Sequence, residues 1–255
     1  MFKTKNQILN HKVYIFGLDG NLINSFPIHL KTAEKTFRMI IESRSTNIMP
    51  KEYYAKLYKK TSGLPTSEQF TIAFKEVRGK NPDTKLANKF EKKFNKQIAQ
   101  KTSKAPLMPG AKQLLKFLKR SSQCTLVIST SHNINDIPQL IKGTGLDKYV
   151  DIILAQGGVY KKTKKGWGIE TKNSNFKKGK PYFEYLKKKL HIKSSQIVYI
   201  ASTPGDIDKA KTEKCIVIGI AQIQNLNQIK AKKTYLVYNS LVEFFETIKD
   251  NKISP

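Results

Sequence analysis

The chain has 255 residues, of which 47 are lysine or arginine and 19 are aspartate or glutamate, giving a formal net charge of +28. Hydrophobic residues make up 39% and aromatic residues 10%, which is enough for a packed core and excludes a wholly disordered chain. No stretch approaches the ~20 consecutive apolar residues that a membrane-spanning helix requires, so an integral membrane protein is excluded as well.

Short apolar runs separated by helical patterns predict a sheet of parallel strands. The runs end in polar or small residues and span 13–16, 125–128, 151–154, 197–200, 216–220 and 235–237. Between them, apolar residues at helical spacing predict helices over 110–120, 181–190 and 240–248. This alternation is typical of a doubly wound α/β fold, in which the functional site lies at the carboxyl ends of the strands.

The stretch 27–105 differs from the rest, because it contains no strand-like run and its apolar residues recur at helical spacings. It begins soon after the first predicted strand and ends before the turn-rich sequence at 106–110. We therefore predict that residues 1–26 and 106–255 form the α/β core and that residues 27–105 form an inserted helical module.

Residues 160–180 are predicted to form a long loop, with eight lysines against the single acid Glu170. A basic loop of this kind predicts binding to a polyanion, such as RNA or a ribonucleoprotein. The alternative is compositional drift, since the chain has only four arginines and is rich in lysine, asparagine and isoleucine. The candidate polyanion-binding residues are Lys161, Lys162, Lys164 and Lys165.

Four short motifs follow one another in the order of the predicted elements. They are the sequence from 16 to 25 after the first strand, Ser129 at the end of the second strand, the pair Lys180-Pro181, and the sequence from 200 to 206. In this order they resemble the haloacid dehalogenase-like hydrolases, and most closely the phosphoglycolate phosphatase-like branch with a helical cap. The resemblance covers nearly the whole chain, and it implies a Rossmann-like α/β core with an inserted α-helical cap.

The resemblance also implies a reaction. In the family, the first aspartate attacks phosphorus, a second aspartate two residues later acts as general acid and base, and Mg²⁺ is held by further carboxylates. In this chain Gly17 stands at the nucleophile position, and Ser202 replaces the main metal-binding aspartate. Asp19 remains as a vestigial acid/base residue, and Asp206 remains as a weak metal ligand.

Some of the family's phosphate-binding groups are retained. By the resemblance, Ser129 and Lys180 are candidates for binding a phosphate or another anion, together with the amides of a helix expected just after Ser131. No cofactor is expected, and Mg²⁺ is expected only if activity is retained.

We predict a catalytically inactive relative that is kept as a basic binding or structural protein, for example in a ribonucleoprotein such as a mitochondrial ribosome. The alternative is an active phosphatase that acts on a small phosphorylated substrate through a rearranged site. Two isolated cysteines, Cys124 and Cys215, predict a reducing intracellular compartment. The sequence favours neither the cytoplasm nor the mitochondrion.

Overall fold

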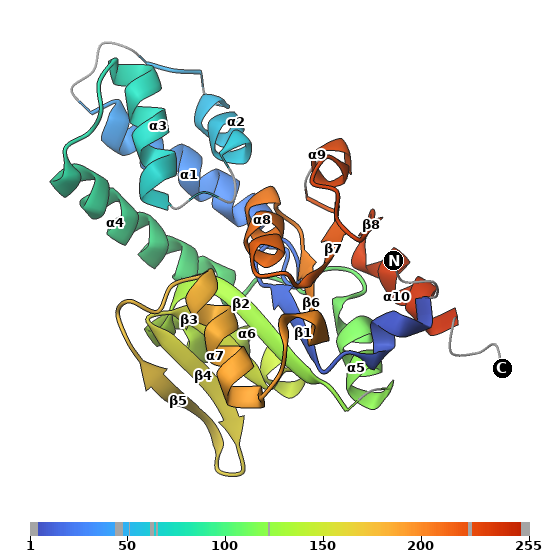
Figure 1. The fold of residues 1–255 in the computed structure, drawn as a ribbon. Helices are drawn as coiled ribbons and strands as arrows, with labels where there is room; N and C mark the ends of the chain where they lie inside the picture. Colours follow the sequence, from blue (N-terminus) through green and yellow to red (C-terminus); the bar gives the residue numbers. More distant parts are fainter. Residues whose placement is uncertain are drawn as a thin grey trace. The chain divides into compact units, whose positions relative to one another are not determined.

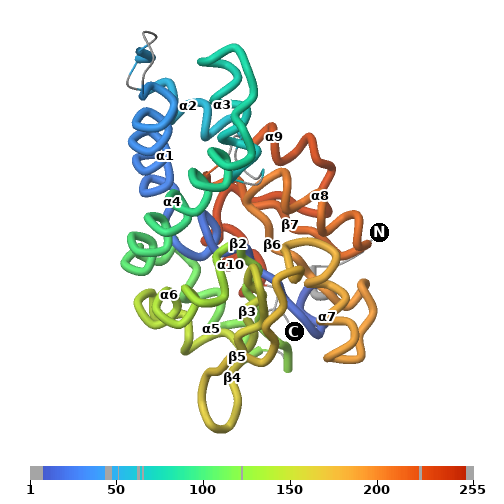
Figure 2. Tube along the Cα trace, turned by 90° about the vertical axis from the view of Figure 1, so that its left-hand side faces the viewer, coloured from blue at the N-terminus to red at the C-terminus, as the bar shows by residue number. Residues whose placement is uncertain are grey.

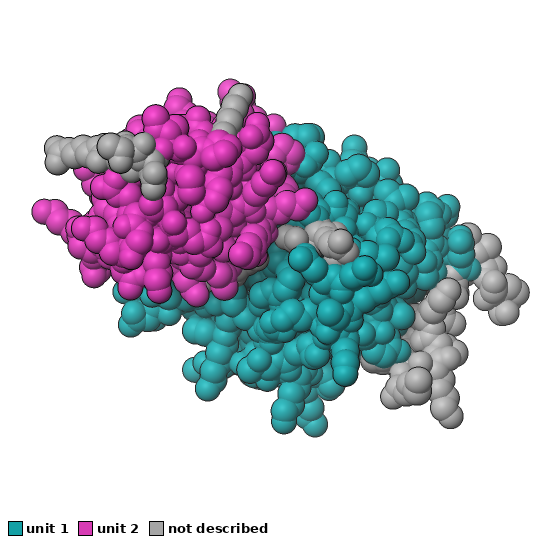
Figure 3. Space-filling view, turned by 90° about the horizontal axis from the view of Figure 1, so that it is seen from above, with its two compact units in different colours: residues 1–24, 105–255 teal, residues 25–104 magenta. Residues whose placement is uncertain are grey.

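The computed structural model describes residues 5–43, 48–50, 52–61, 64, 66–121, 123–223 and 226–250. The chain separates into two compact units, shown in different colours in Figure 3. Met1–Asn24 and Ala105–Pro255 form one unit, which we call the core unit. Ser25–Lys104 form the other, which we call the helical unit.

The core unit is built on an eight-stranded sheet with the order β5-β4-β3-β2-β1-β6-β7-β8 (Figure 1). The strands from β3 to β8 in this order pair in parallel, and β4 and β5 add an antiparallel hairpin at one edge. This arrangement confirms the predicted fold class. The strands are β1 (Val13–Gly17), β2 (Thr125–Asn133), β3 (Ile152–Gln156), β4 (Gly158–Thr163), β5 (Gly166–Lys172), β6 (Ile197–Ala201), β7 (Ile216–Ile220) and β8 (Leu236–Tyr238).

Helices cover the sheet because alternate strand residues point to opposite faces and both sets are apolar. Val13 and Ile15 of β1 share one core cluster with Leu186 of α7 and Ile207 of α8, whereas Tyr14 of β1 is buried outside that cluster. Helix α5 packs against β2 and α10 (Figure 2). The helices of the core unit are α5 (Ala111–Ser121), α6 (Ile137–Thr144), α7 (Lys180–Leu190), α8 (Pro204–Thr212), α9 (Leu226–Lys230) and α10 (Leu241–Asp250).

The helical unit contains α1 (Phe26–Ile41), α2 (Tyr53–Lys60), α3 (Thr66–Arg78) and α4 (Thr84–Thr102). Its apolar residues form a core cluster of their own, centred on the buried ring of Phe37. This ring lies 4.8 Å from that of Phe90, and Phe90 in turn stacks on Phe70 at 4.2 Å. Aromatic packing of this density explains why 27–105 shows helical periodicity in its large apolar residues.

The structure corrects two predictions about local structure. Residues 160–180 are not one long loop, because most of β4 and all of β5 lie within them. The second strand does not end at Ser129, since β2 continues to Asn133 and α6 begins only at Ile137. In both places polar and basic residues occupy strand positions, so a search for apolar runs does not find them.

Within the described ranges, no helix combines the length and the apolar character that crossing a membrane requires.

Candidate functional site

The carboxyl ends of β1, β2 and β6 meet at one edge of the sheet, because these neighbouring strands are parallel. Gly17 is the last residue of β1 and pairs in register with Ser129 of β2. On the other side of β1, Ser202 follows directly after β6. The structure therefore brings together these three sequence-predicted positions.

Position 17 has room for a side chain that it does not carry. A Cβ atom added to Gly17 would lie 3.6 Å from Cβ of Asn21 and 3.7 Å from Oδ2 of Asp206, which are ordinary contact distances. Asn21 is fully buried, and its Nδ2 donates to the carbonyl oxygen of Ile200 at 2.9 Å. Its Oδ1 has no hydrogen-bond partner among the described residues. The loop after β1 thus keeps a buried polar side chain beside a position that has no side chain.

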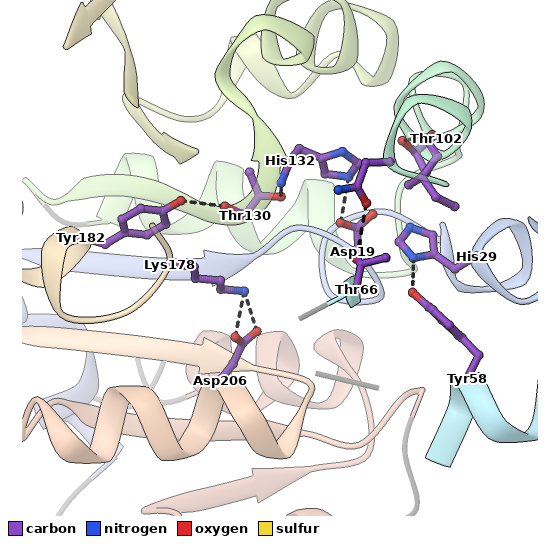
Figure 4. Close-up of polar contacts among 12 residues, drawn as sticks. Asp19, His29, Tyr58, Thr66, Thr102, Thr130, His132, Lys178, Tyr182 and Asp206 are labelled. Atoms are coloured by element: carbon purple, nitrogen blue, oxygen red, sulfur yellow. Dashed lines mark hydrogen bonds and ion pairs between the residues drawn. The ribbon is translucent and has the colours of Figure 1, made fainter. Parts of the chain in front are cut away.

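Asp206 lies in the first turn of α8 and forms the most buried ion pair of the site with Lys178 (Figure 4). The Nζ atom of Lys178 lies 2.8 Å from both carboxylate oxygens of Asp206. Only 17% and 11% of the two side chains are exposed. Burial lowers the pKa of Lys178, but the Asp206 carboxylate more than offsets this effect and holds that pKa above its usual value. Lys178 is therefore cationic and already neutralised by its partner.

Asp19 and His132 form a second pair at the same edge, with His132 Nε2 3.0 Å from Asp19 Oδ2 (Figure 4). The side chain of His132 is 7% exposed and that of Asp19 25%. Burial lowers the pKa of His132, but the charge and hydrogen bond of Asp19 and the charge of Asp136 together raise it, so the net shift is upward. When the pH is at or below the usual pKa of histidine, the pair therefore consists of an imidazolium and a carboxylate.

Ser129 is buried at the centre of this edge, where it forms a side-chain hydrogen bond with Tyr199 of β6. Burial and the nearby Asp206 carboxylate raise the pKa of Tyr199 to about 12, against the opposing effects of Lys178 and Ser129. Tyr199 is therefore neutral at physiological pH.

Lys180, which was predicted to bind phosphate, does not occupy the position expected for it. It is the first residue of α7, its side chain is 74% exposed, and it pairs with Glu184 one turn later at 3.6 Å. The lysine beside Asp206 is Lys178, on the other side of Gly179, whose φ of 136° redirects the chain. The predicted helix amides after Ser131 are also absent from the described structure, because the chain there is still extended.

The four lysines predicted to bind a polyanion lie away from this edge. Lys161 and Lys162 belong to β4, and Lys164 and Lys165 form the turn between β4 and β5.

Sequence patterns missed Lys178 and His132. His132 lies in the polar end of β2, where buried and exposed residues alternate from Thr130 to Asn133. That period of two is the signal that could have placed His132 on the inner face of an extended strand. Lys178 carries no comparable signal, since it is one of several lysines in a short segment.

The residues present do not fit Mg²⁺. This ion needs several anionic oxygens in a near-octahedral set. Position 17 has no side chain and position 202 is a serine, while the remaining carboxylates, Asp19 and Asp206, are bound to cations at 3.0 and 2.8 Å. A step assisted by Mg²⁺ is therefore not assigned to this site.

The Asp19–His132 pair predicts an unusual pH dependence of stability. Because the pKa of His132 is raised in the folded state, the pair stabilises the fold below the usual histidine pKa of 6.5 and loses this contribution as pH rises through the folded pKa. In Asp19→Asn the burial effect, which is the largest influence on the pKa of His132, is opposed only by the charge of Asp136, so stability should rise with pH in the same window. Each slope is at most about 1.4 kcal/mol per pH unit, the value for one proton.

Urea unfolding at pH 5.5 to 8.5 measures both slopes, and His132→Gln is the control in which this contribution vanishes. Equal slopes in the wild type and Asp19→Asn would show that the two side chains do not interact in solution.

The sheet order and the site at its carboxyl edge define a Rossmann-like α/β protein. The family profile of haloacid dehalogenase-like hydrolases matches residues 14–220. The chain belongs to the haloacid dehalogenase-like hydrolase family.

Solved structures with the same fold cover nearly the whole chain. A predicted phosphoglycolate phosphatase from Haemophilus somnus has a TM-score of 0.70 at 18% identity and covers 93% of this chain and 97% of its own. A putative beta-phosphoglucomutase from Thermotoga maritima has a TM-score of 0.60 at 17% identity, with 94% and 99% covered. CbbY from Rhodobacter sphaeroides, in complex with phosphate, has a TM-score of 0.65 at 13% identity, with 92% and 96% covered. No curated protein sequence matches the chain.

Proposed function

We propose that this protein binds a phosphate or a similar small anion at the carboxyl edge of its sheet and does not hydrolyse phosphate esters through an aspartyl-phosphate. The observation that carries the proposal is Gly17 at the end of β1, next to Ser129 and the Lys178–Asp206 pair. No carboxylate at this position can attack phosphorus, because glycine has no side chain.

Three features support an anion at this edge. The missing carboxylates at positions 17 and 202 remove two charges that would repel it. Lys178, His132 and the Ser129 hydroxyl surround the same edge. The structurally similar CbbY was solved with phosphate, which is consistent with a phosphate site on this fold.

The proposal is tested by activity and binding together. We expect purified protein to release no p-nitrophenol from p-nitrophenyl phosphate above background with Mg²⁺, and to bind inorganic phosphate equally well with and without EDTA by calorimetry. The variant Lys178→Met/Asp206→Leu, which leaves no unpaired buried charge, should weaken phosphate binding, whereas Lys180→Met, at an exposed position, should not. Turnover that disappears in Asp19→Asn would overturn the proposal.

That outcome would instead support an active hydrolase with a rearranged site, which is the second candidate. The Asp19–His132 contact is the observation that favours it, because an imidazolium held by a carboxylate can protonate a leaving group.

We further propose that the excess positive charge serves a nucleic-acid partner, such as the RNA of a ribonucleoprotein or of a mitochondrial ribosome. A net charge of +28 attracts phosphate polyanions strongly at low salt. A reducing intracellular location is part of this proposal, since Cys124 and Cys215 are not joined in a disulfide in the described part of the chain, and burial raises the pKa of Cys215 to about 12. Co-sedimentation of the protein with ribosomal particles at moderate salt tests the partner, and absence from that fraction contradicts it.

A further inference from the structure

The β4–β5 hairpin is an ordered projection of the core unit. Its strands pair from Gly158↔Lys172 to Thr163↔Gly166, and Figures 1 and 2 both show its turn projecting beyond the other elements of that unit. The turn is fixed by the Thr163 hydroxyl, which donates to the Gly166 carbonyl at 2.8 Å and accepts from the Lys165 amide at 3.2 Å. Gly166 has a φ of 108°, a conformation that favours glycine.

The hairpin is anchored to its own unit along its length. The Trp167 ring stacks on Tyr160 at 5.3 Å, and its Nε1 donates to the Asp147 carbonyl at 3.2 Å. On β5, Glu170 pairs with Lys189 of α7 at 2.5 Å and accepts a hydrogen bond from Tyr185. The aromatic residues of the hairpin and its only acidic residue are therefore all engaged in contacts within the core unit.

The turn itself keeps its positive charge. Lys162, Lys164 and Lys165 are exposed, and none of them forms an ion pair with any residue that the structure describes. Lys161 differs from these three, because it is half-buried and its charge acts on Glu170. Three unpaired ammonium groups thus stand within four residues on a rigid turn.

We propose that this hairpin tip is a docking surface for the phosphate backbone of a nucleic acid. The inference rests on the proposed nucleic-acid partner and assigns the contact to Lys162, Lys164 and Lys165. Lysine ammonium groups bind phosphates as point charges, so three of them on one projecting turn suit a phosphate backbone. Because the turn is already ordered, binding costs little backbone entropy.

The side chains at the hairpin tip do not recognise particular bases. Trp167 and Tyr160 are stacked on each other, so bases do not stack on them, and lysine–phosphate contacts carry no sequence information. We therefore expect RNA and DNA strands of equal length to bind with similar affinity and salt dependence. A membrane surface fits the tip less well, because the turn carries no large apolar side chain to insert and the hairpin's exposed apolar residue, Ile169, lies back along β5.

The test compares two triple variants of the full chain. The hairpin variant changes Lys162, Lys164 and Lys165 to Gln. The matched control makes the same change at three exposed lysines of α5 and α6, which are Lys112, Lys116 and Lys142. Binding to labelled 20-nucleotide RNA and DNA strands is measured by anisotropy between about 50 and 200 mM salt, a range in which phosphate contacts respond strongly. Each lost contact should lower the slope of log affinity against log salt by ~0.7, so the hairpin variant should lose about two units and the control much less.

The outcomes separate this inference from the proposed function. If the wild type binds no strand at the lowest salt, both the nucleic-acid partner and the hairpin surface are wrong. If the wild type binds and the hairpin variant keeps its slope, only the hairpin surface is wrong. Strong quenching of the single tryptophan, Trp167, on RNA binding would contradict the phosphate-only contact. Binding to anionic vesicles but not to either strand would overturn the proposal in favour of a membrane.

Discussion

The double variant Gly17→Asp/Ser202→Asp should bind Mg²⁺ and gain Mg²⁺-dependent phosphatase activity. The substitution at 17 is sterically compatible, since an added Cβ meets only ordinary contacts, the nearest at 3.6 Å. It places a carboxylate beside Lys178 and Asp206, and the change at 202 supplies a second one next to the end of β6. Together they restore the several anionic oxygens that Mg²⁺ requires.

Thermal unfolding reads Mg²⁺ binding independently of turnover. At a free Mg²⁺ concentration about ten times the dissociation constant, linkage should stabilise the double variant by about 1.4 kcal/mol. The matched control is Gly17→Asn/Ser202→Asn, which has the same shape without the charges. If the double variant folds but Mg²⁺ stabilises it no more than this control, the inherited site geometry is lost. In that case neither variant should turn over p-nitrophenyl phosphate.

Breaking the Lys178–Asp206 pair should destabilise the core unit strongly. Asp206→Leu leaves a buried ammonium group without its partner, and Lys178→Met leaves a buried carboxylate, since the two side chains are only 17% and 11% exposed. Removing one partner of a buried ion pair typically costs about 3–5 kcal/mol. The variant Lys178→Met/Asp206→Leu should lose less than either single variant, because no unpaired charge remains.

Urea unfolding of the four proteins forms a double-mutant cycle. The control is the exposed pair Lys180–Glu184, where Lys180→Met should change the free energy of unfolding by no more than about 1 kcal/mol. Additive effects of the two buried substitutions would contradict a coupled pair.

The two ion pairs of the site, Asp19–His132 and Lys178–Asp206, each join segments that are far apart in the sequence. Asp19 and His132 come from the loop after β1 and the end of β2, and Lys178 and Asp206 come from the segments before α7 and within α8. Each pair neutralises a charge that would otherwise be buried alone, which is unfavourable in a poorly solvated site. The site is therefore stable without a metal ion to balance its carboxylates.

The sequence by itself determined the α/β core, because a strand buried on both faces must be apolar along its whole length. The runs at 13–16, 197–200 and 216–220 lie within β1, β6 and β7 for this reason. Gly17 and Ser202 were identified through the resemblance to the haloacid dehalogenase-like hydrolases, whose motif residues stand at the ends of such strands.

Only the tertiary structure decided which side chains meet at the site. The Lys180-Pro181 pair marks a helix start, but the turn at Gly179 places Lys178 rather than Lys180 beside Asp206. The β4–β5 hairpin is lysine-rich because it lies at the edge of the sheet with most of β5 exposed, so its strands carry no continuous apolar run. Pairing across an edge and contacts between distant loops depend on how the chain packs in three dimensions, and local sequence patterns do not encode that packing.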